Sequence, residues 1–335
     1  MHAILEWLMD GPAWVRYRCL KDLLEMGEDT ESVQAARKEM LSDPQILKLI
    51  IDLEEWELKP LKRHNDAIHP IHKLVFLADI GLTVNDPGIS AILTNIKHHQ
   101  STDGPFQVLS NYPTVFGGSG QDEWLWCSCD APSTLYAMQK MGMQDDPQVN
   151  SAVDFLAALG RNNGWPCKAD SQLEKFKGPG KQSDPCPYAN LIMLKMLAVR
   201  SSSGDQTNIQ SGLKTALLLW ESSWSQQPYL FKMGKDFRKL KVPFIWYDLL
   251  HLAETLSYYP QIHKDKRFIE ILSLLESKQD AAGKFTSESI WSKWSGWEFC
   301  QKREPSRWVT LCALRILKRS GRWPIPTPHA ELHKS

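Results

Sequence analysis

The stretch DAPSTLYAMQKMGMQDDPQVNSAVDFLAALGRNNGWPC, residues 130–167, decides the fold. Apolar residues recur at helical spacing after Pro132, and Gly142 ends that pattern, as glycine does after a last helical turn. The Asp-Pro pair at 146–147 opens a second apolar helical stretch, and Gly-Trp at 164–165 follows its end. The stretch therefore predicts two antiparallel helices followed by a glycine-aromatic return.

This hairpin pattern repeats along the chain. Prolines that precede helical stretches recur roughly every 55–62 residues, a period typical of helical repeats; they are Pro12, Pro70, Pro132, Pro187, Pro243 and Pro305. One hairpin cannot bury its apolar faces alone, but stacked neighbours can. We therefore expect an all-α domain over residues 1–320, with about six hairpins closed into inner and outer rings. The proline-rich residues 321–335 are expected to extend from it as a tail.

Composition narrows the function classes. Lysine plus arginine equals aspartate plus glutamate at 39 each, which argues against a general nucleic-acid binder. No stretch of about 18 apolar residues occurs, so no membrane span is predicted. The first residues lack the features of a signal peptide, and the seven cysteines are scattered. We expect reduced thiols and a cytoplasmic location.

The segments around the six helix starts carry thiol, charged and aromatic side chains, a combination that is unusual for a surface that only faces solvent. If the ring closes, these groups face one another at one opening, and a pocket with convergent polar groups is the default candidate site. Three cysteines stand out: Cys129 and Cys186 occupy equivalent places in adjacent units, and Cys167 lies in the return between them. Such thiols predict a zinc site. Asp130 and Asp184 can alternatively be helix N-caps, and a redox or nucleophilic cysteine is a further alternative.

The returns QSTDGPF, NNGWPC and KQDAAGKF resemble the repeat motif of the α/α-toroid family, which includes protein prenyltransferase β subunits and squalene/terpene cyclases. Residues 178–188, GPGKQSDPCPY, resemble the prenyltransferase stretch that supplies a zinc aspartate and cysteine. This resemblance implies an α/α toroid in which Asp184, Cys186 and His251 bind zinc and Lys181 lies near a substrate diphosphate. It also implies that a second subunit is a possible partner.

The leading hypothesis is a zinc-dependent, prenyltransferase-like enzyme acting on a small apolar or isoprenoid-like ligand. The candidate catalytic residues are Asp130, Tyr247, Asp248 and Lys181, and the candidate metal ligands are Cys129, Cys167, Asp184, Cys186 and His251. The candidate substrate-binding residues are Arg16, Arg18, Trp165, Tyr188, Asn190, Trp246, Lys302 and Trp308. The alternatives are a toroid that binds a hydrophobic ligand or peptide without catalysis, and a toroid polysaccharide lyase that uses Tyr247 and His251.

Overall fold

Helices dominate the computed structural model of the chain, which confirms the predicted all-α class. The structure describes residues 2–178, 180–200, 206–223, 225 and 235–323. The predicted tail, residues 321–335, lies outside the described residues except for its first three positions. None of the described helices is both long enough and apolar enough to span a lipid bilayer.

Six helices, which we call the inner helices, are buried over most of their surface. They are α2 (Ala13–Arg18), α5 (Pro70–Ile80), α7 (Ala131–Met138), α9 (Pro187–Ala198), α11 (Leu249–Ser257) and α13 (Arg307–Arg319). Every residue of α5 and α11 is buried. A helix that is covered all round must have neighbours on every face, so these helices form the interior of the molecule.

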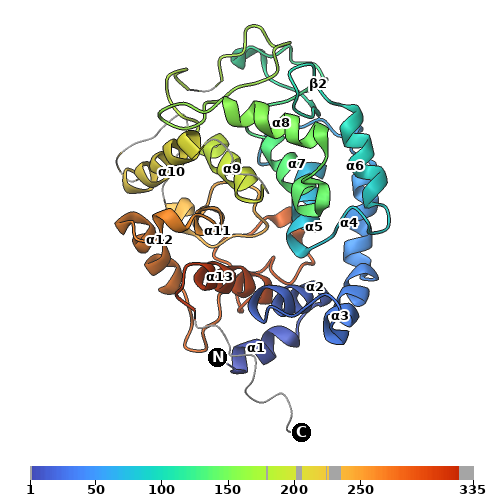
Figure 1. Ribbon diagram of the computed structural model, residues 1–335, viewed down its shortest axis with the longest axis vertical. Helices are drawn as coiled ribbons and strands as arrows, with labels where there is room; N and C mark the ends of the chain where they lie inside the picture. Colours follow the sequence, from blue (N-terminus) through green and yellow to red (C-terminus); the bar gives the residue numbers. More distant parts are fainter. Residues whose placement is uncertain (1, 179, 201–205, 224, 226–234, 324–335) are drawn as a thin grey trace.

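The other helices are amphipathic and lie outside this inner set. They are α1 (His2–Met9), α3 (Glu31–Leu41), α4 (Pro44–Glu54), α6 (Ile89–His98), α8 (Pro147–Ala158), α10 (Gln206–Glu221) and α12 (Lys266–Glu276). In α4 the buried residues are Ile46, Leu49, Ile50 and Leu53, which is the 3.6-residue spacing of a single apolar face. Figure 1 shows α3, α4, α6, α8, α10 and α12 at the periphery.

The inner helices contact one another in a series that returns to its first member. Helix α2 contacts α5, and the contacts continue through α7, α9, α11 and α13 back to α2 (Figure 1). At this last junction the Lys318 ammonium donates to the backbone carbonyls of Asp22 and Leu23 at 2.8 and 3.0 Å. Helix α1 packs on both α13 and α2. The two ends of the helical series are therefore joined by direct contacts.

Most of the predicted helix starts lie where the sequence signals put them. Pro70 and Pro187 are the first residues of α5 and α9, and the Asp146 carboxylate caps α8 by accepting from two backbone N–H groups. Pro243 is different, because α11 begins only at Leu249. The Asp248 side chain accepts from the His251 backbone N–H there, so a cap rather than the proline sets that boundary.

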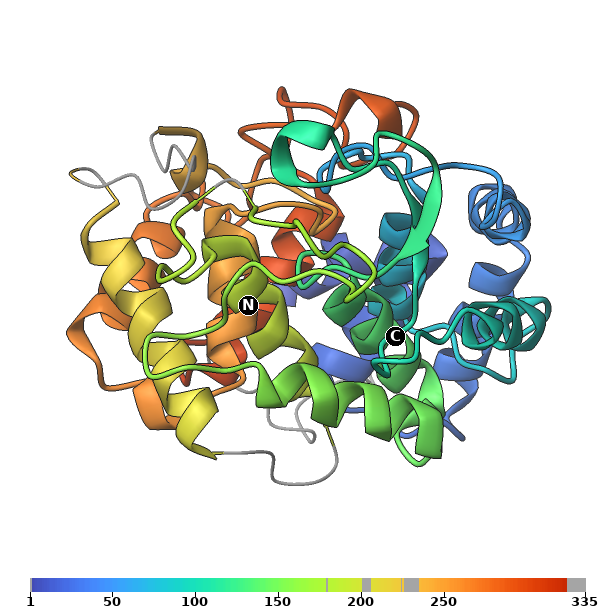
Figure 2. The same cartoon turned by 90° about the horizontal axis from the view of Figure 1, so that it is seen from above.

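Long connections precede several inner helices and gather on one side of the molecule. Figure 2 shows the connections around residues 105–128 and 285–305 on the same side. The first connection contains two short antiparallel strands that the sequence analysis did not predict, β1 (Val108–Ser110) and β2 (Glu123–Leu125). The inner helices thus present their N-terminal ends to a layer of loops, and that layer holds the cysteines discussed below.

Candidate metal centre

Two chain segments are paired so that three cysteines lie close together. Cys127 and Cys129 lie between β2 and α7, and Cys127 forms a bridge with Ala169 of the next return. The Ser128 backbone N–H donates to the Lys168 carbonyl at 2.8 Å. This pairing places Cys167 beside the Cys-Ser-Cys segment.

A fourth cysteine reaches the same place from the start of α9. The Cys186 sulfur caps this helix by accepting from the Ala189 backbone N–H at 3.5 Å. Its own backbone N–H donates to the Trp165 carbonyl at 2.9 Å, which ties the helix start to the return. The Cys186 and Cys129 sulfurs lie 3.9 Å apart. Three successive segments of the chain thus contribute sulfur atoms to one cluster.

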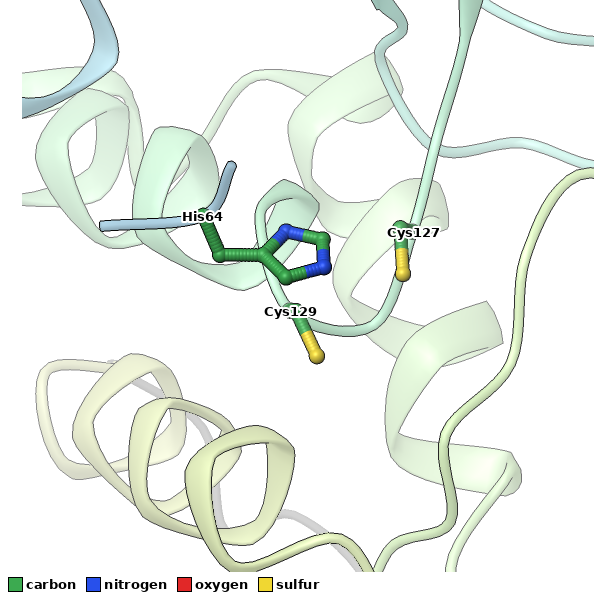
Figure 3. Close-up of side chains that lie close together, drawn as sticks. All are labelled: His64, Cys127 and Cys129. Carbon is green, nitrogen blue, oxygen red and sulfur yellow. The ribbon is translucent and has the colours of Figure 1, made fainter. Parts of the chain in front are cut away.

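A histidine completes the cluster from the connection between α4 and α5. Figure 3 shows the His64 ring directed between the side chains of Cys127 and Cys129. Ligand atoms of these three residues all lie within 4.8 Å of one another. His64 Nδ1 lies 2.9 and 3.0 Å from the two carboxylate oxygens of Asp130, and the Tyr112 hydroxyl donates to Asp130 at 3.2 Å. We call His64, Cys127, Cys129, Cys167 and Cys186 the sulfur–imidazole cluster.

Asp130 fixes which nitrogen of His64 faces the sulfurs. Burial alone would lower the pKa of His64, but the adjacent Asp130 carboxylate raises it to about 9. Because Nδ1 faces the Asp130 carboxylate at 2.9 and 3.0 Å, Nε2 is the ring nitrogen that remains for the sulfur side. In metal sites, the histidine nitrogen that does not bind the metal usually hydrogen-bonds to a carboxylate or a carbonyl, and Asp130 would play that part for His64.

Within the cluster the thiols divide into two kinds. Hydrogen bonds from Cys129 and Cys167 lower the pKa of the Cys127 thiol, and the same two partners lower the pKa of Cys186. The pKa values of Cys129 and Cys167 are raised because these thiols act as the donors. Two of the four sulfurs are thus favoured as thiolates, the form that binds metals.

The spacing of the sulfurs fits a metal better than a disulfide. A disulfide needs sulfurs about 2.05 Å apart, whereas all seven cysteines are free thiols in the structure. Zinc–sulfur bonds of about 2.3 Å in a tetrahedron place two sulfurs about 3.8 Å apart. The observed 3.9 Å between Cys129 and Cys186 is close to that edge. The donor set of thiols and one imidazole is also the one that Zn²⁺ prefers.

The structure brings together three of the five residues predicted as metal ligands, Cys129, Cys167 and Cys186. His251 lies elsewhere: its Nδ1 is 2.8 Å from the Trp246 carbonyl oxygen, and its ring stacks on Phe244 at 5.2 Å. Half-buried Asp184 lies two residues before Cys186, and its backbone N–H donates to the Lys181 carbonyl at 3.0 Å.

The four predicted catalytic residues are also dispersed. Asp130 orients His64, as described above, whereas Lys181 is exposed on the return before α9. Tyr247 is buried and stacks on Phe237 at 4.7 Å between ring centroids. Asp248 is the buried cap of α11. The structure therefore does not gather these four side chains at one point.

The predicted aromatic and amide substrate residues are mostly packed in the core. The Trp165 indole N–H donates to the Leu156 carbonyl at 3.2 Å, and the Asn190 amide donates to the Gly212 carbonyl at 3.0 Å. Trp308 lies in an aromatic cluster against Phe76, with ring centroids 5.7 Å apart. These side chains have ordinary packing and hydrogen-bonding partners, which is sufficient to explain their burial.

Tyr188, next to the cluster at the start of α9, packs its ring against that of Trp246. Their rings are 4.3 Å apart, and the Tyr188 hydroxyl donates to the Ile245 carbonyl at 2.8 Å. Burial raises the pKa of Tyr188, and the negative charge of Asp130 raises it further. These two aromatic rings therefore lie next to the sulfur–imidazole cluster on the side of α9 and α11.

The predicted cationic substrate residues lie at different places in the molecule. Arg16 forms an ion pair with Glu39. Arg18 donates to the Asp22 carboxylate through two nitrogens, at 2.9 and 2.6 Å, at the C-terminal end of α2. Lys302 is exposed before α13. The structure places no two of these three cations at one phosphate-sized site.

His64 and Tyr112 are site residues that sequence reasoning missed. His64 lies between α4 and α5, outside the proline, Asp-Pro and glycine-aromatic markers that identified the repeat. Cys127 lies two residues before Cys129 and was not among the predicted metal ligands. The Cys-Ser-Cys spacing at 127–129 was the available signal for Cys127, since both sulfurs can reach one ion from such a segment.

The comparisons with known proteins add no relative: no protein-family model matches the chain, and no curated protein matches it. The function must therefore be argued from the site.

If the cluster holds a metal ion, replacing Asp130 by asparagine should weaken its binding about 10–100-fold, because the carboxylate that orients His64 is lost. The measurement is competition with a chromophoric chelator. The same substitution at exposed Asp145, which lies in the turn before α8, is the control and should leave the affinity unchanged. Equal affinities for Asp130→Asn and the unmodified protein would show that His64 needs no such support.

Asp248 gives a second prediction, on stability. Its Oδ1 accepts from the His251 backbone N–H at 2.9 Å, whereas its buried Oδ2 has no hydrogen-bond partner, and burial raises its pKa to about 7. The folded pKa lies above the unfolded value of about 3.9, so this group's contribution to stability is lost progressively as pH rises from about 4 to about 7. Asp248→Asn should therefore stabilise the protein by up to about 4 kcal/mol at pH 8, and by only about 1.5 kcal/mol at pH 5.

Urea unfolding at the two pH values checks this expectation. Asparagine caps a helix about as well as aspartate, whereas Asp248→Ala loses both the charge and the cap, so it should be about 1 kcal/mol less stable than Asp248→Asn at either pH. If Asp248→Asn leaves the pH dependence of unfolding unchanged, the buried carboxyl is not the group responsible.

Proposed function

We propose that the chain is a zinc-dependent, prenyltransferase-like enzyme with the α/α-toroid fold. The closed series of inner helices, each paired with an amphipathic outer helix, supports the toroid assignment. The convergence of four thiols and the His64 imidazole at one end of the inner helices carries the zinc assignment. The resemblance of residues 178–188 to a prenyltransferase zinc stretch supports the substrate class.

Four residues are proposed as the zinc ligands: His64 through Nε2, and the thiolates of Cys127, Cys129 and Cys186. Zinc in proteins is usually tetrahedral, so four donors fill its coordination sphere. Cys167 is the most exposed of the four thiols and lies on a loop, which makes it the donor left over. When bound, zinc would lower the pKa of the cysteine thiols that coordinate it, and a substrate thiol would have to replace one of these four ligands to reach the metal.

The chain's own residues would bind the substrate in a cavity beside His64. We call this the His64 cavity; it has a volume of about 460 Å³ and is lined by Lys62, Arg63, Asn65, Asp66, Ala67, Trp291, Ser292 and Lys293. Three of these side chains are cations, which would attract an anionic head group. The Trp291 ring offers an apolar wall, and the Lys241 ammonium lies 3.1 Å from its centroid.

Zinc and this cavity are linked through the connection that carries His64. Lys62 and Arg63 immediately precede His64, and Asn65 and Asp66 immediately follow it. The His72 ring also holds this connection, since its Nε2 lies 2.9 Å from the His64 carbonyl oxygen. If a metal holds His64 in place, the adjacent Lys62 and Arg63 would also be held in position before the substrate binds, which lowers the entropic cost of binding.

The proposal is tested by measuring zinc content and then prenyl diphosphate binding on the full chain. We expect about one zinc per chain, and calorimetric binding of a prenyl diphosphate that is lost after chelation. Lys62→Gln combined with Lys293→Gln should weaken that binding without releasing zinc. Absence of zinc would refute the metal site, whereas stoichiometric zinc without prenyl diphosphate binding would refute the enzyme and retain the metal site.

A further inference from the structure

A second basic cavity lies at the other end of the inner helices. It has a volume of about 440 Å³, within the usual range for small-molecule sites. Six cations line it: Arg18, Lys21, Lys140, Arg315, Lys318 and Arg319. The remaining lining residues are Asp22, Glu25 and Tyr258. We call it the C-end cavity because its residues lie at the C-terminal ends of α2, α7, α11 and α13.

The C-end cavity is well separated from the metal centre along the inner helices. Asp130 of the metal centre directly precedes α7, and Lys140 follows the end of the same helix. Ten residues at 1.5 Å per residue make this separation about 15 Å. A ligand in the C-end cavity would therefore not contact the sulfur–imidazole cluster.

Acidic side chains neutralise only part of the positive charge around the C-end cavity. Six lining cations face two lining carboxylates, and two further buried carboxylates, Asp79 and Glu254, lie behind them. Asp79 accepts from Lys140 at 3.2 Å, and Glu254 accepts from Arg315 at 3.1 Å as well as from Arg319. Glu28 pairs with Lys21 at 3.1 Å and Lys195 pairs with Asp79 at 3.7 Å, so with these two included seven cations face five carboxylates and a surplus of two positive charges remains.

Two nitrogens of one buried guanidinium have no hydrogen-bond partner. Arg315 is 3% exposed, and its Nη2 donates to Glu254. Its Nη1 and Nε have no hydrogen-bond partner, although Nε forms an ion pair with Asp22 at 3.3 Å. Arg315 also lines the cavity, so an anion bound there would add a counter-charge beside this guanidinium.

We propose that the C-end cavity binds a phosphate group, either as inorganic phosphate or as part of a small phosphorylated molecule. Planar guanidinium groups match the oxygen spacing of phosphate, and three arginines line the cavity, Arg18, Arg315 and Arg319. Lys21, which lies three residues after Arg18, and Lys140, which follows α7, add point charges. This site is separate from the proposed zinc enzyme and stands whether or not that function is correct.

The test is calorimetry on the zinc-loaded full chain, with inorganic phosphate and then pyrophosphate at fixed ionic strength. We expect one saturable phosphate site per chain and a rise in melting temperature with phosphate. Lys140→Gln should weaken binding at least tenfold. Because the Lys62→Gln, Lys293→Gln double variant alters only the His64 cavity, its phosphate affinity should stay within twofold of the unmodified chain.

Lys21→Glu keeps the test valid if Lys140→Gln does not fold. Lys21 is half-buried at the cavity rim, and reversing its charge should also weaken phosphate binding at least tenfold. The proposal is overturned by absence of a saturable phosphate site, by unchanged affinity in these variants, or by loss of binding in the His64-cavity variant. Unchanged affinity would mean that the cations only neutralise the ends of the helices.

Discussion

Cys129→Ser should lower the zinc affinity of the protein by about 100–1,000-fold. Structural zinc sites with four ligands bind with about 10–16 kcal/mol, so one ligand accounts for about 3–4 kcal/mol. Cys129 is the central thiol of the cluster, since its sulfur lies 3.9 Å from that of Cys186 and its side chain hydrogen-bonds with Cys127 and Cys167. Chelator competition measures the affinity, and the zinc-dependent rise in melting temperature should shrink with it.

Cys300→Ser is the matched control for this loss. Cys300 is a half-buried free thiol that donates to the Trp291 carbonyl at 3.2 Å and is remote in sequence from the cluster. Serine can donate the same bond, so zinc affinity should not change. If both serine variants lose zinc equally, or neither does, the four-ligand site proposed here is wrong.

Glu254→Gln should destabilise the folded protein by about 3–5 kcal/mol. This carboxylate is 1% exposed and accepts from Arg315, from Arg319 and, at 3.3 Å, from the Tyr258 hydroxyl. Removing its charge while keeping its shape leaves buried Arg315 and half-buried Arg319 without a counter-charge that both share, and breaking a buried ion pair from one side costs about this much. Denaturant unfolding monitored by circular dichroism gives the free energy.

Glu276→Gln provides the comparison for a partly exposed pair. Glu276 accepts from Arg322 at 2.6 Å near the end of α12, and such pairs are worth about 0–1 kcal/mol. A loss of less than about 1 kcal/mol in Glu254→Gln as well would mean that water or neighbouring carboxylates already compensate Arg315 and Arg319.

The repeat could be read from the sequence because its markers are local. A proline at a helix start, an Asp-Pro pair and a glycine at a helix end each act through their own backbone conformation. Pro70, Pro187 and Asp146 consequently lie at helix starts in the structure. Gly81 likewise ends α5 with a positive φ of 102°. No knowledge of distant contacts was needed for these positions.

The site was only partly predictable because it depends on contacts between distant segments. Cys129, Cys167 and Cys186 could be expected to meet, since each lies at a repeat boundary. His64 reaches them from an irregular connection, and its partner Asp130 is 66 residues away. Arg18 was expected near the metal, but it follows the turns of α2 to the opposite end of the inner helices. The direction in which the chain runs through a helix decides at which end of the helix a side chain lies. The spacing of the sequence markers does not give that direction.

The zinc K-edge X-ray absorption spectrum of the purified full chain is the most direct test of the metal centre. The proposed ligands predict three sulfur scatterers at about 2.3 Å and one imidazole nitrogen at about 2.0–2.1 Å. His64→Ala should remove the nitrogen and keep the sulfurs. A first shell of oxygen and nitrogen alone, or a protein that takes up no zinc, would contradict the assignment of Cys127, Cys129, Cys186 and His64 as ligands.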